Sequence, residues 1–380
     1  TSHTGAMAGS DRAYDAFLEQ SGAIRVANFD DLIDVSSTLA SAPRLGGDRV
    51  AVVTSTGGGG VLVADACGVL GFRVPPPDEE TAARLGTFLV GDSAVPDRNP
   101  IDVTLAGLKP EIFRGVIEAL LDSPSYDAVI VIVGSSALAA PDLAARPMIE
   151  AARERRKPIL AYVSPSAAHI VQNLNRNGVP AFSTPEACAT GLDALRRRAS
   201  MLVPREDQAG SQPDSVIPAT PHGPLNEIDC AALFAAFGIA GPRMTVASSG
   251  EEASAQVQAV GGPAALKVLS RDIAHKSDVD GVRLNVTADI AAQRFDEIMH
   301  AARTHQPEAR LEGVLVQQMV VDGVELILGS SRDPQLGAMI LLGFGGVTAE
   351  LFEDIAIRFP PISRSDALAM IDALRSAPLL

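Results

Sequence analysis

The sequence contains no tryptophan, and phenylalanine and tyrosine together make up only 4% of the chain. Cysteine is also rare, with three residues in the chain. Cys67, Cys188 and Cys230 are far apart in the sequence, and no two of them form a CxxC pair. This scattering argues against a structural zinc site and indicates reduced, buried thiols in a cytoplasmic protein. The low aromatic content neither indicates nor excludes a pocket for an aromatic acid.

Two further features are missing. The sequence has no run of about 18 apolar residues. It also has no signal peptide, in which a charged segment is followed by an apolar one, so we expect a soluble protein that does not bind membranes. Basic residues number 31 against 46 acidic ones, and the net charge of −15 argues against nonspecific nucleic-acid binding. Anionic ligands must therefore be bound by local groups, such as helix N-termini and single lysines.

The chain has 380 residues, of which 47% are hydrophobic, so it can form two or three domains. Its first half alternates short β-branched runs with segments of helical length. Strands are expected at 49–54, 127–133 and 158–163, and helices at 60–71, 110–122, 141–156 and 184–199. Continuous apolar strands separated by helices predict an α/β fold, with a doubly wound parallel sheet covered on both faces.

The composition changes after this alternating region. Residues 204–224 contain five prolines and no apolar periodicity, which predicts an interdomain linker. Beyond the linker, helices are expected at 226–237 and 249–260, together with antiparallel strands joined by short turns. The second half is therefore predicted to be an α+β domain.

The stretch "VTSTGGGGVLVAD" (53–65) places four glycines, Gly57, Gly58, Gly59 and Gly60, between a strand and a helix. Glycine allows close approach of a ligand, and the unpaired N–H groups of the first helical turn can bind an anion. The stretch is not a Walker A loop, because no lysine follows the last glycine. It is not a dinucleotide-binding fingerprint either, because the glycine spacing of that motif is missing. A simple tight turn is the alternative.

Two lysines bracket the polar turn in "ALKVLSRDIAHKSDVDGVRL" (265–284). Lys267 lies in an apolar strand, where its ammonium group needs an anionic partner or access to water. Lys276 lies in the turn that ends at Gly281. This pair suits a loop that closes over nucleotide phosphates, and the alternative is a solvent-directed lysine beside a solvated turn.

A second polar pair lies in "GVLVQQMVVDGVELILG" (313–329), where Gln318 and Glu325 flank a turn. An amide can bind the edge of adenine, and a carboxylate can accept hydrogen bonds from ribose hydroxyls. The alternative is a polar hairpin without a ligand.

Taken together, these stretches resemble the NDP-forming acyl-CoA synthetases, relatives of succinyl-CoA synthetase. "SHTGAMAGSDRAYDAFLEQSGAIRV" is similar to the phosphohistidine segment of that family, and "VAVVTSTGGGGVLVADACGVLGF" with "NPIDVT" to its second flavodoxin-like module. "GPAALKVLSRDIAHKSDVDGVRLNV", "GVLVQQMVVDGVELILGSSRDPQLG" and "GFGGVTAELFEDIAIRFPPIS" resemble its ATP-grasp module. The resemblance covers almost the whole chain and keeps the order of the family's motifs.

The resemblance implies an ADP-forming reaction that converts a carboxylic acid, CoA and ATP to acyl-CoA, ADP and phosphate. His3 would carry the phosphoryl group between two distant sites, as a neutral imidazole can. Gly57–Gly60 would open the helix that faces phosphohistidine. Lys267 and Lys276 would contact the ATP phosphates, with Gln318 and Glu325 at the adenine and ribose. Mg²⁺ is implied by phosphoryl transfer in general.

Two residues depart from the family pattern. Asp280 occupies a position in the phosphate loop where relatives often have glycine, so it could stiffen the turn or repel phosphate. Gln318 stands where relatives often have glutamate, a change that could alter nucleotide preference.

The resemblance also implies domain limits. Residues 1–45 would hold the phosphohistidine segment and the end of a truncated flavodoxin-like domain, 46–203 a second flavodoxin-like domain, and 225–380 an incomplete ATP-grasp domain. The CoA-binding module is missing, and the Mg²⁺ ligands are expected beyond residue 380. The chain is therefore expected to be a fragment that forms a homodimer or pairs with the missing modules.

Two alternative functions remain at this point. One is a ligand-sensing synthetase-like module of a protein acetyltransferase, and the other is a nucleotide-binding scaffold subunit. The presence of His3 favours the synthetase, because a sensor needs no phosphoryl carrier.

Overall fold

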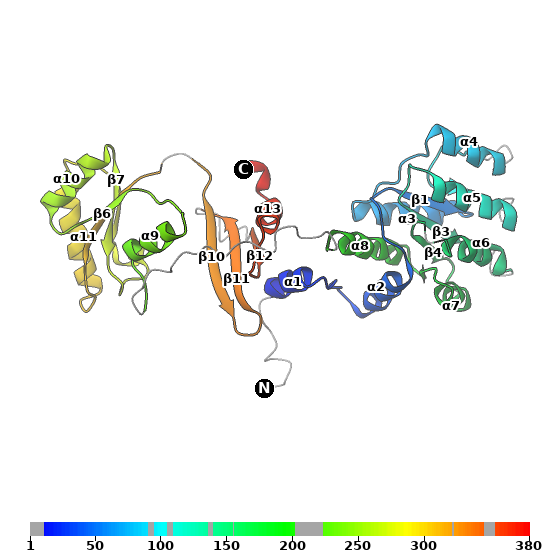
Figure 1. Ribbon diagram of the computed structural model, residues 1–380, viewed down its shortest axis with the longest axis horizontal. Coiled ribbons are helices and arrows are strands. Elements are labelled where there is room, and N and C mark those ends of the chain that lie inside the picture. The colour runs from blue at the N-terminus through cyan, green and yellow to red at the C-terminus, as the bar shows by residue number, and fades with distance from the viewer. Residues whose placement is uncertain are drawn as a thin grey trace. The chain divides into compact units, whose positions relative to one another are not determined.

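The computed structural model describes residues 11–89, 95–104, 109–135, 140–154, 156–201, 223–320, 323–345 and 354–380 (Figure 1). His3 lies outside these ranges. The chain divides into two compact units, each of which is discontinuous in sequence. The first comprises Thr1–Glu206, Leu328–Leu341 and Ala356–Met370, and the second comprises Asp207–Ile327, Leu342–Ile355 and Ile371–Leu380.

The first unit contains a five-stranded parallel sheet with the strand order β2-β1-β3-β4-β5. Its strands are β1 (Val50–Thr54), β2 (Ile101–Asp102), β3 (Ala128–Val133), β4 (Ile159–Val163) and β5 (Ala181–Phe182). Every residue of β1, β3 and β4 is buried, as expected for β-branched runs with helices on both sides. This order is that of flavodoxin-like folds.

Helices cover both faces of this sheet. One face packs against α4 (Glu79–Phe88), α5 (Pro110–Asp122), α6 (Asp142–Ala152) and α7 (Ala168–Arg176). The other packs against α3 (Gly57–Val69) and α8 (Pro185–Met201), and α2 (Phe29–Ser41) lies against α8. The doubly wound parallel sheet predicted from the sequence is therefore confirmed.

The second unit contains a four-stranded antiparallel sheet with the order β6-β9-β7-β8. Its strands are β6 (Met244–Ala247), β7 (Ala264–Leu269), β8 (Val282–Val286) and β9 (Gly313–Gln318). One face packs against α10 (Gly250–Val260) and α11 (Ala291–His305) in an apolar core. Helix α9 (Glu227–Ala236) has no fully buried residue, unlike α10 and α11.

A third sheet has three strands in the order β10-β11-β12, namely β10 (Leu326–Asp333), β11 (Gly337–Phe344) and β12 (Ile355–Arg358). The chain continues into α13 (Arg364–Asp372) and a short 3₁₀ turn, η5 (Ala377–Leu379). The α+β character expected for the second half is therefore observed in these sheets and helices.

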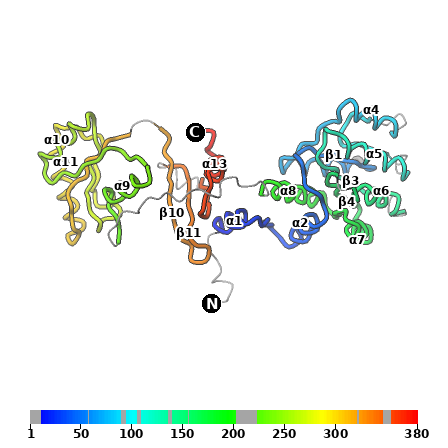
Figure 2. Tube along the Cα trace, in the orientation of Figure 1, coloured from blue at the N-terminus to red at the C-terminus, as the bar shows by residue number. Residues whose placement is uncertain are grey.

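Helix α1 (Asp11–Gln20) contacts the end of β12, within the first unit. The Gln20 amide donates to the carbonyl oxygen of Phe359 at 3.0 Å and accepts from its N–H at 2.6 Å. The Phe17 ring meets the ring of Phe359 edge to face, with 5.6 Å between centroids. Figure 2 shows α1 next to the orange and red segments of the chain. A helix from the start of the sequence is thus fixed to a strand from its last part.

Most expected element limits lie within one or two residues of those observed, but the helix expected at 141–156 ends at Ala152, and the start of α3 also differs. Helix α5 has the predicted limits, whereas α3 begins at Gly57 and not at residue 60. The glycines are therefore the first turn of the helix and not a loop before it. Most of the expected linker lies outside the described residues, and the expected domain limits stay predictions. In the part of the chain that the structure describes, no helix is long and apolar enough to cross a membrane.

Candidate nucleotide and phosphate sites

The glycine-rich turn lies at the carboxyl end of β1. In the sheet, β1 lies between β2 and β3. In open α/β sheets of this order, the position where the strand order reverses is where ligands bind. The N–H groups of Gly59 and Gly60 already donate to the carbonyl oxygen of Thr56, at 3.2 and 3.4 Å. Thr56 is the N-cap residue, but its side chain makes no capping hydrogen bond. The N-terminus remains the end of α3 that favours an anion, because the helix dipole is positive there.

Close packing explains two of the four glycines. A Cβ atom on Gly59 would lie 3.1 Å from Ile132 Cγ2, and one on Gly60 would lie 3.0 Å from both Pro100 Cβ and Thr54 Cγ2. Gly58 would meet no atom within 4 Å. Gly59 and Gly60 thus allow α3 to start directly against the sheet, whereas Gly58 has no steric requirement.

Hydroxyl groups shape the same turn. Thr54 Oγ1 donates to the carbonyl oxygen of Thr56 at 2.6 Å and accepts from its N–H at 2.9 Å, which fixes the backbone before α3. Ser55 Oγ is buried and has no hydrogen-bond partner among the described residues. A buried hydroxyl without a partner is uncommon, and a phosphate oxygen would supply the missing acceptor. The turn therefore fits a phosphoryl group.

Asn99 holds the "NPIDVT" segment beside β1. Its side-chain oxygen accepts from the Val52 N–H at 2.9 Å, and its Nδ2 donates to the carbonyl oxygens of Val50 and Pro75 at 2.8 and 2.9 Å. The Asn99 side chain thus makes hydrogen bonds to the backbone of β1. This arrangement also places Pro100 against Gly60.

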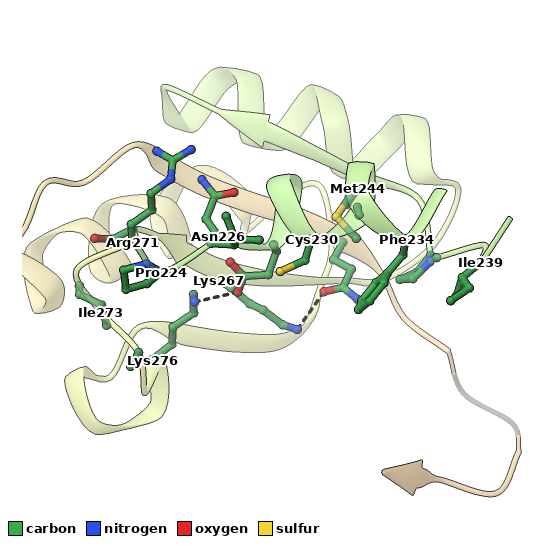
Figure 3. Close-up of a pocket in the computed structure, with 18 of the residues that line it drawn as sticks. Pro224, Asn226, Cys230, Phe234, Ile239, Met244, Lys267, Arg271, Ile273 and Lys276 are labelled. Carbon is green, nitrogen blue, oxygen red and sulfur yellow. Dashed lines mark hydrogen bonds and ion pairs between the residues drawn. The ribbon is translucent and has the colours of Figure 1, made fainter. Parts of the chain in front are cut away.

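A second candidate site is a cavity of about 570 Å³ in the second unit (Figure 3). One wall is formed by α9 and the segment that follows it, and the other by β7, β9 and residues 270–276. Beyond the polar start of α9, this side of the cavity is apolar and includes Ala231 and Phe234 of α9, Ile239 after it and Met244 of β6. An apolar wall opposite two lysines suits a ligand with a planar apolar part and an anionic part.

Both predicted lysines, Lys267 and Lys276, line this cavity, and each is held by a side-chain acceptor (Figure 3). Lys267 Nζ donates to Gln317 Oε1 at 2.8 Å, and Lys276 Nζ lies 2.8 Å from Glu227 Oε1. An ammonium group has three N–H donors, so each lysine keeps two for a ligand. Lys267 and Lys276 thus line the same cavity, and their contact with nucleotide phosphates stays a prediction.

A polar network fixes the start of α9 at the edge of the cavity. Asn226 and Asp229 form a capping box, and Asn226 Nδ2 donates to Glu312 Oε2 at 3.0 Å. The Arg271 guanidinium contacts Asp229 at 2.8 Å and Glu312 at 3.0 Å. These contacts satisfy the first turn of α9 and fix its position relative to β7 and β9.

The loop after β7 contains a short 3₁₀ turn, η4 (Lys276–Val279). The next residue is its C-cap, Asp280, whose φ of 52° is left-handed, and this explains why glycine would also suit the position. Arg283 binds the Asp280 carboxylate at 2.8 Å, and these hydrogen bonds lower the pKa of that carboxyl. The negative charge that departs from the family pattern is thus paired with a cation, which weakens its repulsion of phosphate.

The other predicted residues have different positions. Gln318 does not line the cavity, because side chains alternate along β9 and the neighbouring Gln317 shares the face of Lys267. Glu325 lies outside the cavity lining, close to Gly345, whose N–H donates to the Glu325 carbonyl oxygen at 2.7 Å. Gln317 and Glu227 are the residues that the sequence analysis missed.

The cysteines and potential metal ligands can also be compared with the expectations. Cys67 and Cys188 are buried, and burial raises the pKa of the Cys67 thiol to about 12. Cys230 is half-buried and lines the cavity, so its expected burial is wrong. Among the described ranges, no three His, Cys, Asp or Glu side chains gather in a way that could hold a metal ion.

Comparisons with known proteins agree with this architecture. The model of the ATP-grasp domain matches residues 218–380, and that of the succinyl-CoA ligase like flavodoxin domain matches residues 1–39. The ADP-forming acetate–CoA ligase I of Archaeoglobus fulgidus is 31% identical over 390 residues, which is 100% of this chain and 56% of that protein. The chain therefore spans about half the length of this relative.

Two further matches each cover 41% of the chain. The beta subunit of the ADP-forming acetate–CoA ligase I of Pyrococcus furiosus is 38% identical over 158 residues, 41% of this chain and 68% of that protein. A solved dinucleotide-forming acetyl-coenzyme A synthetase 1 of Ca. Korarchaeum cryptofilum, in complex with coenzyme A, Ca-AMPCP and HgCl+, is 38% identical. It covers 41% of this chain and 69% of that chain, with a TM-score of 0.39. None of these names supports an acetyltransferase module. The beta-subunit match, which is 38% identical and covers 68% of that protein, shows that the chain belongs to the family of ADP-forming acyl-CoA synthetases.

Proposed function

We propose that the chain acts in an ADP-forming acid–thiol ligase, which converts a carboxylic acid, CoA and ATP to acyl-CoA, ADP and phosphate. The observation that carries this proposal is the cavity in which Lys267 and Lys276 face an apolar wall. The names of the family members, which are ADP-forming CoA ligases, support the same reaction.

ATP is proposed to bind in this cavity, with its base against the apolar wall near Phe234 and its phosphates at the lysines. The side-chain partner of Lys267, Gln317, is a neutral amide and brings no negative charge that would repel a phosphate. Two positive groups held in place before the ligand arrives stabilise a polyphosphate without a later cost of ordering them. Glu325 is proposed to contact the ribose only after the ligand has bound.

His3 is proposed to accept the γ-phosphoryl group of ATP. An N–P bond forms at the imidazole while the bond between the γ-phosphorus and the ADP oxygen breaks, so ADP leaves. Phosphohistidine then transfers the phosphoryl group to the carboxylate substrate, and the CoA thiolate displaces phosphate from the resulting acyl phosphate. The α3 N-terminus and Ser55 are proposed to bind the phosphoryl group at this second site.

Some components are not assigned to residues of this chain. Mg²⁺ accompanies phosphoryl transfer in general, but the described residues hold no cluster of His, Cys, Asp or Glu side chains that fits it. Pairing with other modules or a second copy is supported by the relative that is named a beta subunit. A cytoplasmic location is supported by the free thiols of Cys67 and Cys188.

Phosphorylation by γ-labelled ATP with Mg²⁺ tests the proposal. We expect an acid-labile, alkali-stable label on the parent chain and none on His3→Ala. His169→Ala provides a matched control, because His169 lies on α7 and lines neither candidate site. Equal labelling of His3→Ala and the parent would contradict the role of His3, whereas ATP binding without any label would favour a scaffold.

A further inference from the structure

The ion pair between Glu227 and Lys276 joins the two walls of the cavity. Glu227 is the first residue of α9, and Lys276 is the first residue of η4 on the opposite wall. Their side chains are 28% and 15% exposed, so the pair is largely removed from water. In Figure 3 the Lys276 side chain reaches across the cavity to this carboxylate. An acceptor from α9 thus orients an ammonium group that belongs to the proposed phosphate loop.

The position of α9 does not depend on this ion pair. The capping box of Asn226 and Asp229, the Asn226–Glu312 hydrogen bond and the Arg271 contacts already fix the helix start. Oε2 of Glu227 is buried and has no partner among the described residues. Within the described ranges, Lys276 is therefore the polar group to which the Glu227 carboxylate is bound.

The ion pair is compatible with a bound nucleotide. One N–H of the Lys276 ammonium points to Glu227, and the two others are available to phosphate oxygens. A lysine side chain has more rotamer freedom to lose than most others, and an oriented lysine has lost it before the ligand arrives. Repulsion between the carboxylate and phosphate is reduced because Lys276 lies at 2.8 Å from Glu227.

We propose that Glu227 is a positioning residue of the nucleotide site, which holds the Lys276 ammonium where it binds the ATP phosphates. This inference rests on the proposed function of the cavity. Glu227 itself does not touch the phosphates and acts through Lys276. Loss of the carboxylate should therefore weaken binding of the phosphates but not of the nucleoside.

Calorimetric titration of the full 380-residue chain with ATP and with adenosine tests this role. We expect Glu227→Gln to weaken ATP binding about tenfold, because the lysine must then be ordered on binding. Adenosine binding should change less than about twofold, since it lacks the phosphates. Glu251→Gln provides the control, because Glu251 is an exposed acid in the first turn of α10, on the same unit.

A double variant separates positioning from general damage. If Glu227 acts through Lys276, Glu227→Gln in a Lys276→Gln background should weaken ATP binding no further. Additive losses, equal loss of ATP and adenosine affinity, or unchanged or tighter ATP binding by Glu227→Gln would each overturn the inference. Thermal unfolding of each variant verifies that the fold is intact.

The parent chain distinguishes this inference from the function on which it rests. A parent chain that does not bind ATP contradicts the proposed function, and the inference fails with it. A parent chain that binds ATP, together with an unaffected Glu227→Gln variant, contradicts the positioning role alone.

Discussion

The Lys267 ammonium donates a hydrogen bond to the side-chain oxygen of Gln317 across two neighbouring strands, at 2.8 Å. Ala265 is the register partner of Gln317, and Lys267 follows it on the same face of β7. The pair thus depends on the register of β7 and β9. Any slip of one residue would replace Gln317 by a side chain that points to the other face.

The two adjacent glutamines of β9 provide a matched pair of variants. Gln317→Ala should weaken ATP binding by about 1 kcal/mol, or about fivefold, because Lys267 loses its acceptor. Gln318→Ala should leave the affinity unchanged, since Gln318 does not line the cavity. Calorimetric titration with ATP measures both. A larger effect at Gln318 would show that the adenine contact inferred from the sequence is correct.

The glycine-rich turn gives a second matched pair. Gly60→Ala should lower the free energy of unfolding by about 1–3 kcal/mol, because its Cβ would be crowded by Pro100 and Thr54. Gly58→Ala should be neutral or stabilise the protein by up to about 1 kcal/mol, because alanine favours helix and the position is open. Urea unfolding compares the two variants. Equal destabilisation would contradict the steric role of Gly60.

The parallel sheet could be predicted from the sequence because its strands are continuous β-branched runs. Residues 50–54, 128–133 and 159–163 are buried on both faces, and continuous apolar runs of this short length between turn signals are typical of strands in a parallel sheet. The limits of α5 were also predictable, since Pro110 suits the first helical turn and the apolar residues that follow have helical spacing.

Positions that depend on register or on distant partners could not be predicted. In "VLVQQ" the residues of both faces of β9 are apolar before the glutamines, so the pattern does not show which glutamine faces Lys267. Glu227 was missed because its partner lies in another element. The start of α3 was placed too late because four glycines are unfavourable in a helix, whereas packing against Pro100 and Ile132 favours them there.

The contact between α1 and β12 should contribute measurably to stability. Gln20→Ala should cost about 1–2 kcal/mol, because the Phe359 N–H and carbonyl oxygen lose their side-chain partner. Hydrogen exchange at the Phe359 amide should become faster. Gln306→Ala is the control, because Gln306 is exposed at the end of α11. Unchanged exchange at Phe359 would show that α1 does not protect this backbone.

The acid sensitivity of the first unit should depend on Asp78, the N-cap residue of α4. The Ser125 hydroxyl at 2.5 Å and the Thr81 N–H at 2.8 Å stabilise its ionised form and lower its pKa well below the usual 3.8. Because the folded-state pKa is lowered, this stabilisation is present above the unfolded-state pKa and is lost as the pH falls below it.

Asp78→Asn should therefore reduce stability at pH 7, by about 1–2 kcal/mol, and the difference from the parent should shrink below about pH 4. Urea unfolding at several pH values measures this difference. Asp97→Asn, which replaces an exposed acid, is the control. A difference that stays constant from pH 7 to pH 3 would exclude ionisation of Asp78 as the cause.

The contact between Gln20 and Phe359 has a consequence for how the polypeptide can be divided. A cut between Met201 and Gly223 would place the two residues on separate chains. Their hydrogen bonds would then form between molecules, without a connecting segment to keep the partners at a high effective concentration. In the undivided chain this contact does not depend on protein concentration. In the divided protein it would, so the expression level of the two chains would determine what fraction of the molecules make the contact.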